Sequence, residues 1–565
     1  MQYNHCLTYL MEYPYECAEQ LFNRYYANAL ATNIANSTPT LKATFERWKN
    51  TDTAALLSNL MKNEELKSVL LQETPWVLQA QDETKQKKQI GLLFDMVRMS
   101  SELQSSFNKL KDLQSSNGGF VWFKGGPDDR YITQYIATGI GRLRHLKALP
   151  ATTDGMQSLI STIVPYLDKK IKEDYENLVK HKVKLTDNNL GYTQIQYLYM
   201  RSFYPELAIP AASKTAYEYY RKQSQQHWLK QSRYMQGMIA IALNRTGDKT
   251  VSKAIMASLK ENAIVNEEMG MYWKEANTGY GYYWYQAPIE KQALLIEAFK
   301  EVNNDTKAVE DAKTWLLKQK QTQNWRTTKA TADAVYALLL QGSNWLASTP
   351  EVQVTLGTQT IRSTEHNQEA GTGYFKEVIE GSKVKPAMGN IKVTVSNAAN
   401  NAAPSWGAVY WQYFENLDKI THAATPLNLQ KKLFVEKNSA TGPVLTPVNE
   451  GDILKVGDKI KVRIELRVDR DMEYVHMKDM RASCMEPVNV LSGYRYQGGL
   501  GYYETTKDAS TNFFFGYLRK GTWVFEYPMF VTHTGNFSNG ITTIQCMYAP
   551  EFTSHSEGVK VVVEK

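Results

Sequence analysis

Residues 13–26 of the chain have the sequence YPYECAEQLFNRYY, which places one of only four cysteines three residues before a glutamine. A proline precedes this pair and an apolar pattern with helical spacing follows it, so a turn is predicted to lead into a helix near Glu19. Side chains three residues apart at such a point lie on the same side of the chain. We therefore expect the Cys17 thiol and the Gln20 carboxamide to lie within bonding reach.

This pair of side chains has a specific chemistry. The thiolate of Cys17 can attack the side-chain carbonyl of Gln20 and expel ammonia, which leaves an internal thioester. A thioester is an activated acyl group that an amine or a hydroxyl opens, and it persists only where water is excluded. The aromatic rings around the pair, Tyr13 and Tyr15 among them, are predicted to form the wall that excludes water.

Two simpler interpretations of Cys17 stay open. A cysteine at the start of a helix is commonly a small buried hydrophobic residue, and the protein would then be a structural adhesion module. Alternatively, Cys6 and Cys17 form a disulfide, although the chain has neither CxxC pairs nor a dense set of cysteines. Cys484 and Cys546 lie on separate predicted strands, and they are either a disulfide between neighbouring strands or two buried thiols.

Length and composition exclude several classes of protein. At 565 residues the chain is too long for one core, so two to four domains are expected. The net charge of +7 is spread along the chain without a long basic run, so no nucleic-acid partner is expected. No window of 18 apolar residues and no signal-peptide pattern occurs. The nine histidines are scattered without ligand spacing, so neither a metal nor a cofactor is expected.

The first part of the chain, up to about residue 341, has helical periodicity. Clear examples are RYMQGMIAIALNR, residues 233–245, and TKATADAVYALLL, residues 328–340. A loose repeat of helix, turn and helix recurs, with a tryptophan in each turn: Trp122, Trp273, Trp284 and Trp325. Repeated helix pairs must stack on their neighbours, as a solenoid or as a closed ring, and the ring is favoured because it gathers these turns at one end.

Near Pro350 the periodicity changes from helical to alternating. Strands are predicted in EVQVTLGTQTIRS (351–363), NIKVTVSNAA (390–399) and GAVYWQYFENL (407–417), too few for a complete sandwich. A second β block follows, with several strands in residues 451–480 and 520–552, enough for a full antiparallel sandwich.

The motif YPYECAEQ, the helical repeats behind it and the two β blocks together resemble the alpha-2-macroglobulin and complement thioester family, in its bacterial branch. In that family a Pro-Tyr-Gly-Cys-Gly-Glu-Gln motif opens an α/α toroid that is inserted in a CUB domain. The resemblance covers essentially the whole chain. It implies a multidomain α plus β fold: a thioester α/α toroid over residues 1–343, the remaining half of a CUB-like β domain over 344–424, and a macroglobulin-like, receptor-binding-like antiparallel β-sandwich over 425–565. The first half of the CUB domain is then expected upstream of Met1.

The resemblance also implies a function. Members of the family trap proteases, so the expected partners are proteases, captured covalently through lysine amines. The protein is expected to be an endopeptidase inhibitor that acts by single-use acylation, not an enzyme. It is expected in the periplasm or the cell envelope or outside the cell, with the membrane reached only through an anchor outside this chain.

Carried over by position, Cys17 is the thioester sulfur, Gln20 is the acyl donor and Glu19 has a supporting role. Glu16 and Ala18 stand where the vertebrate motif has glycine, and a side chain at either place restricts the turn. His145 and His181 are the histidines at a rough distance from the motif, and both are expected on the surface, so direct attack by lysine is the expected route.

Two further features complete the candidate list. The loop GGLGYYETTKD, residues 498–508, supplies Tyr502 and Tyr503, one of which is predicted to contact the Cys17–Gln20 region and shield it from water. Asp128 and Asp129 are either paired carboxylates of an α/α-toroid carbohydrate-active enzyme, the alternative function, or capping residues of the next helix.

Overall fold

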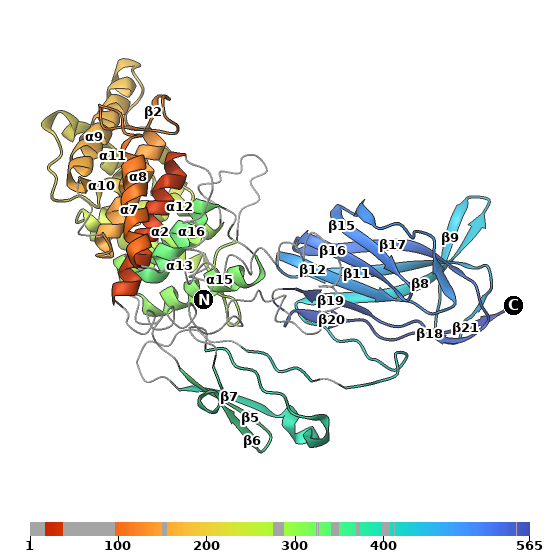
Figure 1. Cartoon of the computed structure of the whole chain (residues 1–565). Helices are drawn as coiled ribbons and strands as arrows, with labels where there is room; N and C mark the ends of the chain where they lie inside the picture. Colours follow the sequence, from red (N-terminus) through yellow and green to blue (C-terminus); the bar gives the residue numbers. More distant parts are fainter. Residues whose placement is uncertain are drawn as a thin grey trace. The chain divides into compact units, whose positions relative to one another are not determined.

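The structure of the protein is a computed structural model that describes residues 17–37, 96–149, 155–274, 288–323, 325, 327–340, 350–368, 373–396, 407–411, 413–547, 549 and 551–565. The chain separates into two compact units. The helical unit contains the helices together with strands β1 to β7, and the sandwich unit contains strands β8 to β21 (Figure 1). Each unit is described by itself.

The helical unit is built from long helices joined by short turns, as the periodicity predicts. Two of the predicted segments are found almost residue for residue, as α12 (Arg233–Arg245) and α16 (Thr328–Leu339). The other helices are α2 (Ala18–Ser37), α7 (Met96–Lys111), α8 (Arg130–His145), α9 (Met156–Lys180), α10 (Tyr192–Arg201), α11 (Ala211–His227), α13 (Lys249–Glu261), α14 (Pro288–Ala298) and α15 (Thr306–Thr322). Short strand pairs β1 (Phe120–Val121) with β2 (Asp128–Asp129), and β3 (Ile264–Asn266) with β4 (Gly270–Tyr272), lie in the connecting turns.

Polar side chains start several of these helices by accepting a hydrogen bond from the first turn. The caps are Asp129 on α8, Ser232 on α12, Asp248 on α13 and Thr327 on α16. In each case the side-chain oxygen satisfies a backbone N–H that has no partner within the helix. Asp129 is thus a helix cap, one of the two roles considered for it from the sequence.

The tryptophans of the turns pack inward. Trp273 is buried, stacks on Phe299 and donates its indole N–H to the backbone carbonyl of Leu259, 2.8 Å away. Trp325 is also buried, and Trp122 stacks on Tyr131 with 6.2 Å between ring centroids. Trp284 lies outside the described residues. These three tryptophans therefore pack the turns against the helices.

Helix α2, which follows the Cys17 motif, lies in contact with α7, α8 and α16 (Figure 1). Its residues Phe22, Tyr25 and Tyr26 are almost completely buried. Phe22 lies over Gly139 of α8, where a Cβ atom would stand 2.2 Å from the phenyl ring. A glycine is needed there, because any side chain on α8 would push the two helices apart.

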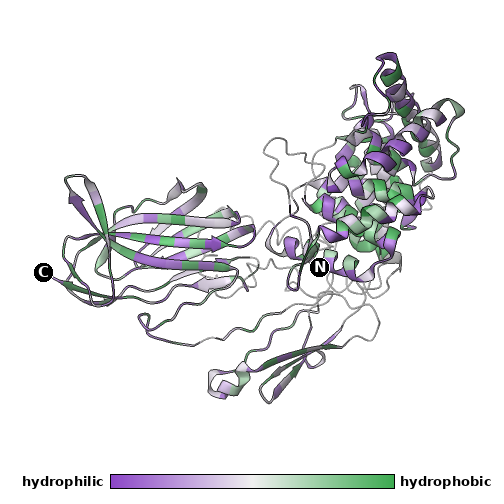
Figure 2. Ribbon diagram, turned by 180° about the vertical axis from the view of Figure 1, so that it is seen from behind, coloured by the Kyte–Doolittle hydropathy of each residue, from purple (hydrophilic) through white to green (hydrophobic). Residues whose placement is uncertain are grey.

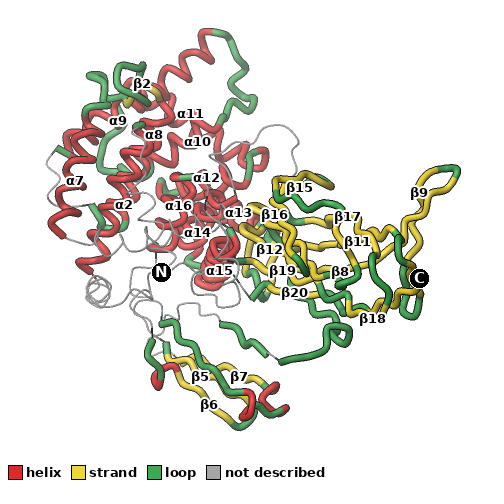
Figure 3. Tube along the Cα trace, turned by 45° about the vertical axis from the view of Figure 1, so that its right-hand side comes forward, coloured by secondary structure: helices red, strands yellow, loops and turns green. Residues whose placement is uncertain are grey.

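A separate three-stranded antiparallel sheet has the order β6-β5-β7, with β5 (Glu351–Leu356), β6 (Gln359–Arg362) and β7 (Ile391–Ser396). These strands match two of the three predicted segments (Figure 3). The third prediction is wrong: within 407–417 the described residues form no strand. Its large apolar side chains, such as Trp411 and Phe414, are exposed. A strand requires a hydrogen-bonded neighbour, and the described part of the chain supplies none to this segment.

The sandwich unit consists mainly of two antiparallel sheets, ordered β13-β17-β11-β8-β9 and β14-β15-β16-β12-β19-β20, with a small sheet β10-β21-β18 beside them. Its strands are β8 (Leu427–Ser439), β9 (Gly442–Pro447), β10 (Ile453–Lys455), β11 (Lys459–Val468), β12 (Met472–Met480), β13 (Met485–Pro487), β14 (Gly493–Gln497), β15 (Leu500–Lys507), β16 (Ser510–Leu518), β17 (Gly521–Val531), β18 (Gly535–Ser538), β19 (Thr542–Cys546), β20 (Thr553–His555) and β21 (Lys560–Glu564). Buried and exposed positions alternate along β11, and the coloured bands of Figure 2 show this alternation on the strands. One face of each large sheet therefore packs into a shared core.

A buried ion pair joins the two large sheets. Nζ of Lys431, on β8, lies 2.7 Å from Oδ1 of Asp479, on β12. Both side chains are almost fully buried. The hydroxyls of Thr542 and Tyr527 also donate to the Asp479 carboxylate. The buried Asp479 carboxylate is thus paired with the Lys431 ammonium and accepts hydrogen bonds from two hydroxyls, as a buried ion pair requires.

Candidate site at the start of helix α2

Cys17 immediately precedes α2, and Gln20 lies in the first turn of that helix. The backbone N–H of Cys17 donates a hydrogen bond to Oε1 of Gln20, 3.4 Å away. The backbone amides of Gln20 and Glu19 also act on the thiol, because they lower the pKa of Cys17. The bond from the Cys17 N–H to the Gln20 side chain is one half of a capping box, in which residues at the cap position and three places later satisfy each other's backbone. The proximity of thiol and carboxamide stays a prediction.

The Cys17 side chain is buried, with 8% of its surface exposed. Burial raises the pKa of the thiol above its ordinary value, and the Glu19 carboxylate acts in the same direction. The two backbone N–H groups act in the opposite direction, because they favour the thiolate. The structure contains Cys17 as a thiol, not as half of a disulfide.

Glu19 is buried beside this pair and ties α2 to a distant helix. Its Oε1 accepts one hydrogen bond from Nδ2 of Asn23 and one from the hydroxyl of Thr328, on α16, both at 2.6 Å. Asn23 in turn accepts a hydrogen bond from the Tyr135 hydroxyl of α8 at 2.7 Å. Burial raises the pKa of Glu19, and the hydrogen bonds from Thr328 and Asn23 oppose this rise.

The aromatic wall predicted around the motif is found only in part. Tyr13 and Tyr15 lie outside the described residues. Phe22 and Tyr25 pack into the helical core, against Tyr135 and Phe107 respectively. The backbone carbonyl of Trp122 accepts a hydrogen bond from the N–H of Ala18 at 3.0 Å, so the Trp-bearing turn also holds the start of α2.

Behind the motif lies a network of buried charges that sequence reasoning missed. Arg142 of α8 forms an ion pair with Asp333 of α16, and its Nη2 lies 3.8 Å from Oε2 of Glu297. Lys329 lies 2.5 Å from the other oxygen of Asp333, and Arg245 lies 2.8 Å from Glu297. Charged residues on a helix usually lie on its solvent-exposed face. These charges are buried only because several helices pack around them.

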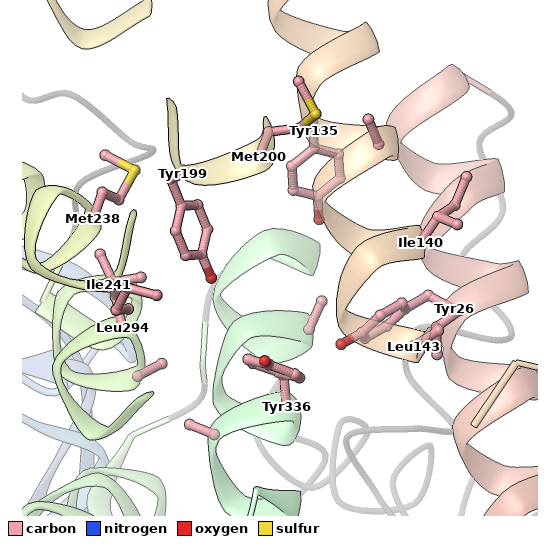
Figure 4. Close-up of a cluster of buried hydrophobic side chains, with 14 of the residues drawn as sticks. Tyr26, Tyr135, Ile140, Leu143, Tyr199, Met200, Met238, Ile241, Leu294 and Tyr336 are labelled. Atoms are coloured by element: carbon pink, nitrogen blue, oxygen red, sulfur yellow. The ribbon is translucent and has the colours of Figure 1, made fainter. Parts of the chain in front are cut away.

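Tyrosines from several helices complete this network. Figure 4 shows Tyr26, Tyr135, Tyr199 and Tyr336 projecting from separate ribbons toward one region. The hydroxyls of Tyr199 and Tyr336 donate to Glu297, at 2.5 and 3.2 Å. The Tyr26 hydroxyl has no hydrogen-bond partner within the described residues, and it lines a cavity of about 20 Å³ together with Tyr135 and Tyr199. That volume suffices for one water molecule.

Glu290 of α14 is a second buried acid near Lys329. Its carboxyl accepts a hydrogen bond from the Thr327 hydroxyl at 3.3 Å, and Oε2 has no partner among the residues that the structure describes. Burial raises the pKa of Glu290 to about 7, although the nearby Lys329 ammonium lowers it.

The other predicted residues lie away from the motif or within the sandwich unit. Asp128 accepts a hydrogen bond from Tyr166, which keeps the pKa of its carboxyl below the usual value. His145 is exposed and lies 3.4 Å from Glu301, and His181 is exposed beside the Asn177 carbonyl.

In the sandwich unit, Tyr502 is buried in the core against the rings of Phe513, Phe515 and Phe525, whereas Tyr503 is half-buried. The contact predicted for these tyrosines stays a prediction. Cys484 and Cys546 are buried thiols and form no disulfide, which decides between the two alternatives.

Within the described parts of the chain, no group of three or more His, Cys, Asp or Glu side chains is placed to hold a metal ion. In the same residues, no helix combines the length and the apolar character needed to cross a membrane.

Comparison with known proteins finds a family model that matches part of the chain. Residues 427–551 match the family model described as the bacterial alpha-2-macroglobulin MG10 domain. This range starts at the first residue of β8 and covers most of the sandwich unit. Over this range the sandwich unit is similar to a macroglobulin domain of the bacterial alpha-2-macroglobulins. The resemblance drawn from the sequence is confirmed. Comparison with curated proteins gives no match.

Solved structures of bacterial alpha-2-macroglobulins are similar to the chain at low identity. Native Escherichia coli alpha-2-macroglobulin, from domain MG7 to the C-terminus, is 11% identical with a TM-score of 0.34, over 99% of this chain and 75% of that chain. Salmonella alpha-2-macroglobulin reacted with methylamine is 14% identical with a TM-score of 0.33, and the match covers 100% of this chain and 31% of that chain. Escherichia coli alpha-2-macroglobulin activated by porcine elastase is 13% identical with a TM-score of 0.38, and the match covers 83% of this chain and 39% of that chain. The chain thus spans about a third of the length of the Salmonella protein.

Proposed function

We propose that the protein is part of a protease trap whose internal thioester, between Cys17 and Gln20, captures an attacking protease. The observation that carries this proposal is the 3.4 Å hydrogen bond from the Cys17 N–H to Oε1 of Gln20 in a buried setting. This bond holds the Gln20 side chain near the backbone of Cys17, and it supports a short path between the two reacting groups before any bond forms.

The chemistry proceeds in two stages. The sulfur of Cys17 attacks the carbonyl carbon of Gln20, the C–N bond breaks, and ammonia leaves. Later a lysine amine of the protease attacks the same carbon, an amide bond forms, and Cys17 leaves as a thiol. Because the acyl group is consumed once, the protein is an inhibitor and not an enzyme. Direct attack by the amine is favoured, since both candidate histidines are exposed on the surface.

The finer domain assignment belongs to the same proposal. Residues 1–343 form the α/α toroid, 344–424 the remaining half of a CUB-like domain, and 425–565 the terminal macroglobulin-like sandwich. Paired helices with capped turns support the first assignment, and the incomplete three-stranded sheet supports the second. We place the protein in the periplasm or cell envelope or outside the cell, where foreign proteases reach it.

The carbohydrate-active alternative receives no support from Asp128 and Asp129. Asp129 is occupied as a helix cap, and Asp128 is bound by Tyr166, so the two do not act as a free pair of carboxylates. The alternative of an adhesion module with an inert Cys17 is distinguished by mass, because an inert cysteine does not expel ammonia from Gln20.

The test is intact mass and thiol labelling of freshly purified protein, before and after treatment with methylamine. The proposal predicts a chain lighter by one ammonia, in which Cys17 resists iodoacetamide until methylamine frees it. A chain of full mass, with Cys17 labelled completely before any treatment, would show that no thioester is present. Cys17→Ala serves as the control, because it removes the nucleophile.

A further inference from the structure

Two residues separate Cys17 from Gln20, and other parts of the helical unit hold both of them. The backbone N–H of Ala18 donates a hydrogen bond to the carbonyl of Trp122, 3.0 Å away, in the turn between β1 and β2. Glu19 is held by its buried side chain. The short segment that joins the two candidate reacting residues is therefore fixed from outside α2 as well as by its own helix.

The Glu19 carboxylate is part of a chain of hydrogen bonds that crosses three helices. Its Oε1 accepts from the Thr328 hydroxyl of α16 and from Nδ2 of Asn23 of α2, both at 2.6 Å. Oδ1 of Asn23 accepts from the Tyr135 hydroxyl of α8 at 2.7 Å. All four side chains are buried. We call these four residues, Tyr135, Asn23, Glu19 and Thr328, the α2 clamp.

The α2 clamp does more than keep α2 in the core. Apolar packing already buries this end of the helix, because Leu21, Phe22 and Tyr25 are almost completely buried. A buried carboxylate costs free energy unless hydrogen bonds compensate it, and an apolar side chain in place of Glu19 would avoid that cost. Hydrogen bonds, unlike apolar contacts, have a required direction. Donors from α8 and α16 therefore set the position and the rotation of the first turn of α2.

We propose that Thr328 and Tyr135, acting through Glu19 and Asn23, position the first turn of α2 for formation of the proposed thioester. This inference rests on the proposed function. Both are positioning residues and take no part in the chemistry. The S–C bond forms, the C–N bond of Gln20 breaks, and the thiol proton leaves with the ammonia, as in the proposed function. Their contribution is geometric, because a displacement of about 1 Å at a reacting pair costs about 100-fold in rate.

The test uses variants of the full chain that remove one hydroxyl each. Thr328→Val keeps the shape of the side chain and removes the donor to Glu19, whereas Thr328→Ser keeps the donor and is its matched control. Tyr135→Phe removes the donor to Asn23. Its matched control is Tyr197→Phe on α10, which also removes a buried tyrosine hydroxyl that donates to a side chain, here Asp168 at 2.6 Å.

Two rates are measured in the same refolding samples. Intact mass follows the appearance of the species that has lost one ammonia, and circular dichroism follows the recovery of the helices. Urea denaturation gives the stability of each variant. A residue with a structural role alone changes stability or refolding, whereas a positioning residue also slows the loss of ammonia from chains that have already refolded.

We expect Thr328→Val to slow the loss of ammonia from refolded chains by about 10-fold, because the lost bond is to a charged group, and Tyr135→Phe to slow it by about 5-fold. Thr328→Ser and Tyr197→Phe should stay within about twofold of wild type, although Tyr197→Phe loses stability. Should Thr328→Val not refold, Tyr135→Phe decides the question by itself.

Three results would contradict the proposal. Wild-type rates in refolded Thr328→Val and Tyr135→Phe would overturn the role of the α2 clamp and leave the thioester function intact. A Tyr197→Phe variant as slow as Tyr135→Phe would assign the effect to general destabilisation and overturn the positioning role. Absence of the ammonia-deficient species in wild type would overturn both the positioning role and the proposed function.

Discussion

Replacing Cys17 by serine or by alanine separates its structural role from its chemical one. The backbone amides of Gln20 and Glu19 lower the pKa of the Cys17 thiol, and in a complete capping box the side chain at this position accepts a hydrogen bond from the first turn of α2. A serine oxygen at this position is a stronger acceptor than sulfur, whereas alanine accepts nothing. Neither variant can form a thioester, so the two report on the cap alone.

The expected difference follows from cap energetics. Losing a serine cap costs about 1 kcal/mol of helix stability, within a range of about 0.5–2 kcal/mol. Cys17→Ala should therefore be less stable than Cys17→Ser by about 1 kcal/mol. Because this cost falls on the first turn of α2, local opening there should become about 5-fold more frequent in the alanine variant.

Hydrogen exchange measured by mass spectrometry on peptides covering residues 17–24 provides the assay. Faster exchange in Cys17→Ala than in Cys17→Ser, with equal exchange in α12 (233–245), would support the capping box. Identical exchange of the two variants at the start of α2 would refute it and remove the structural basis for the reacting pair. In the full-length protein, neither variant should form adducts with proteases that survive denaturing electrophoresis.

Three further outcomes are expected. Lys431→Met leaves a buried carboxylate without its counter-ion and should lower the stability of the sandwich unit by about 3–5 kcal/mol in urea denaturation; a loss below about 1 kcal/mol would show that the pair is not sequestered from water. Glu290, beside Lys329, has a pKa raised from 4.5 to about 7 in the folded state, so wild-type stability should fall by about 3 kcal/mol as the pH rises from 4.5 to 7. Glu290→Gln should flatten that slope in denaturation at a series of pH values, and an unchanged slope would assign it to other groups. Replacing Tyr502 and Tyr503 together by alanine should speed thioester hydrolysis in unactivated full-length protein, with Tyr503 responsible for most of the effect because Tyr502 is buried in its own core; unchanged methylamine reactivity would place the shield elsewhere.

Local patterns predicted local structure well. The apolar spacing of residues 233–245 and 328–340 gave two helices, and alternation gave strands β5, β7 and β11. The hydrogen bond between Cys17 and Gln20 is local in the same way, because it joins residues only three apart. Such features are decided within one turn or one strand, where periodicity and side-chain type suffice.

Features that depend on distant partners were not predictable. The anchor of Glu19, Thr328, lies 309 residues away in sequence, and nothing in either segment indicates the other. Arg142 and Glu297 have the appearance of surface charges until several helices enclose them. The segment around Trp411 alternates like a strand, yet a strand is defined by a neighbour that the described residues do not provide. In each case the structure depends on an interaction between two different helices or strands.

The hydrogen bond between Glu19 and Thr328 has a consequence for biosynthesis. A ribosome makes α2 among the first residues of this chain and α16 some three hundred residues later, so the carboxyl stays unanchored while the intervening helices emerge. The first turn of α2 therefore acquires this partner only after α16 has been made. If the proposed thioester needs the completed helical unit, ribosome-bound chains that end before residue 328 should retain a labelling-competent Cys17, and chains that extend well beyond α16 should lose it. The order of synthesis would then delay the proposed bond until the helical unit is complete.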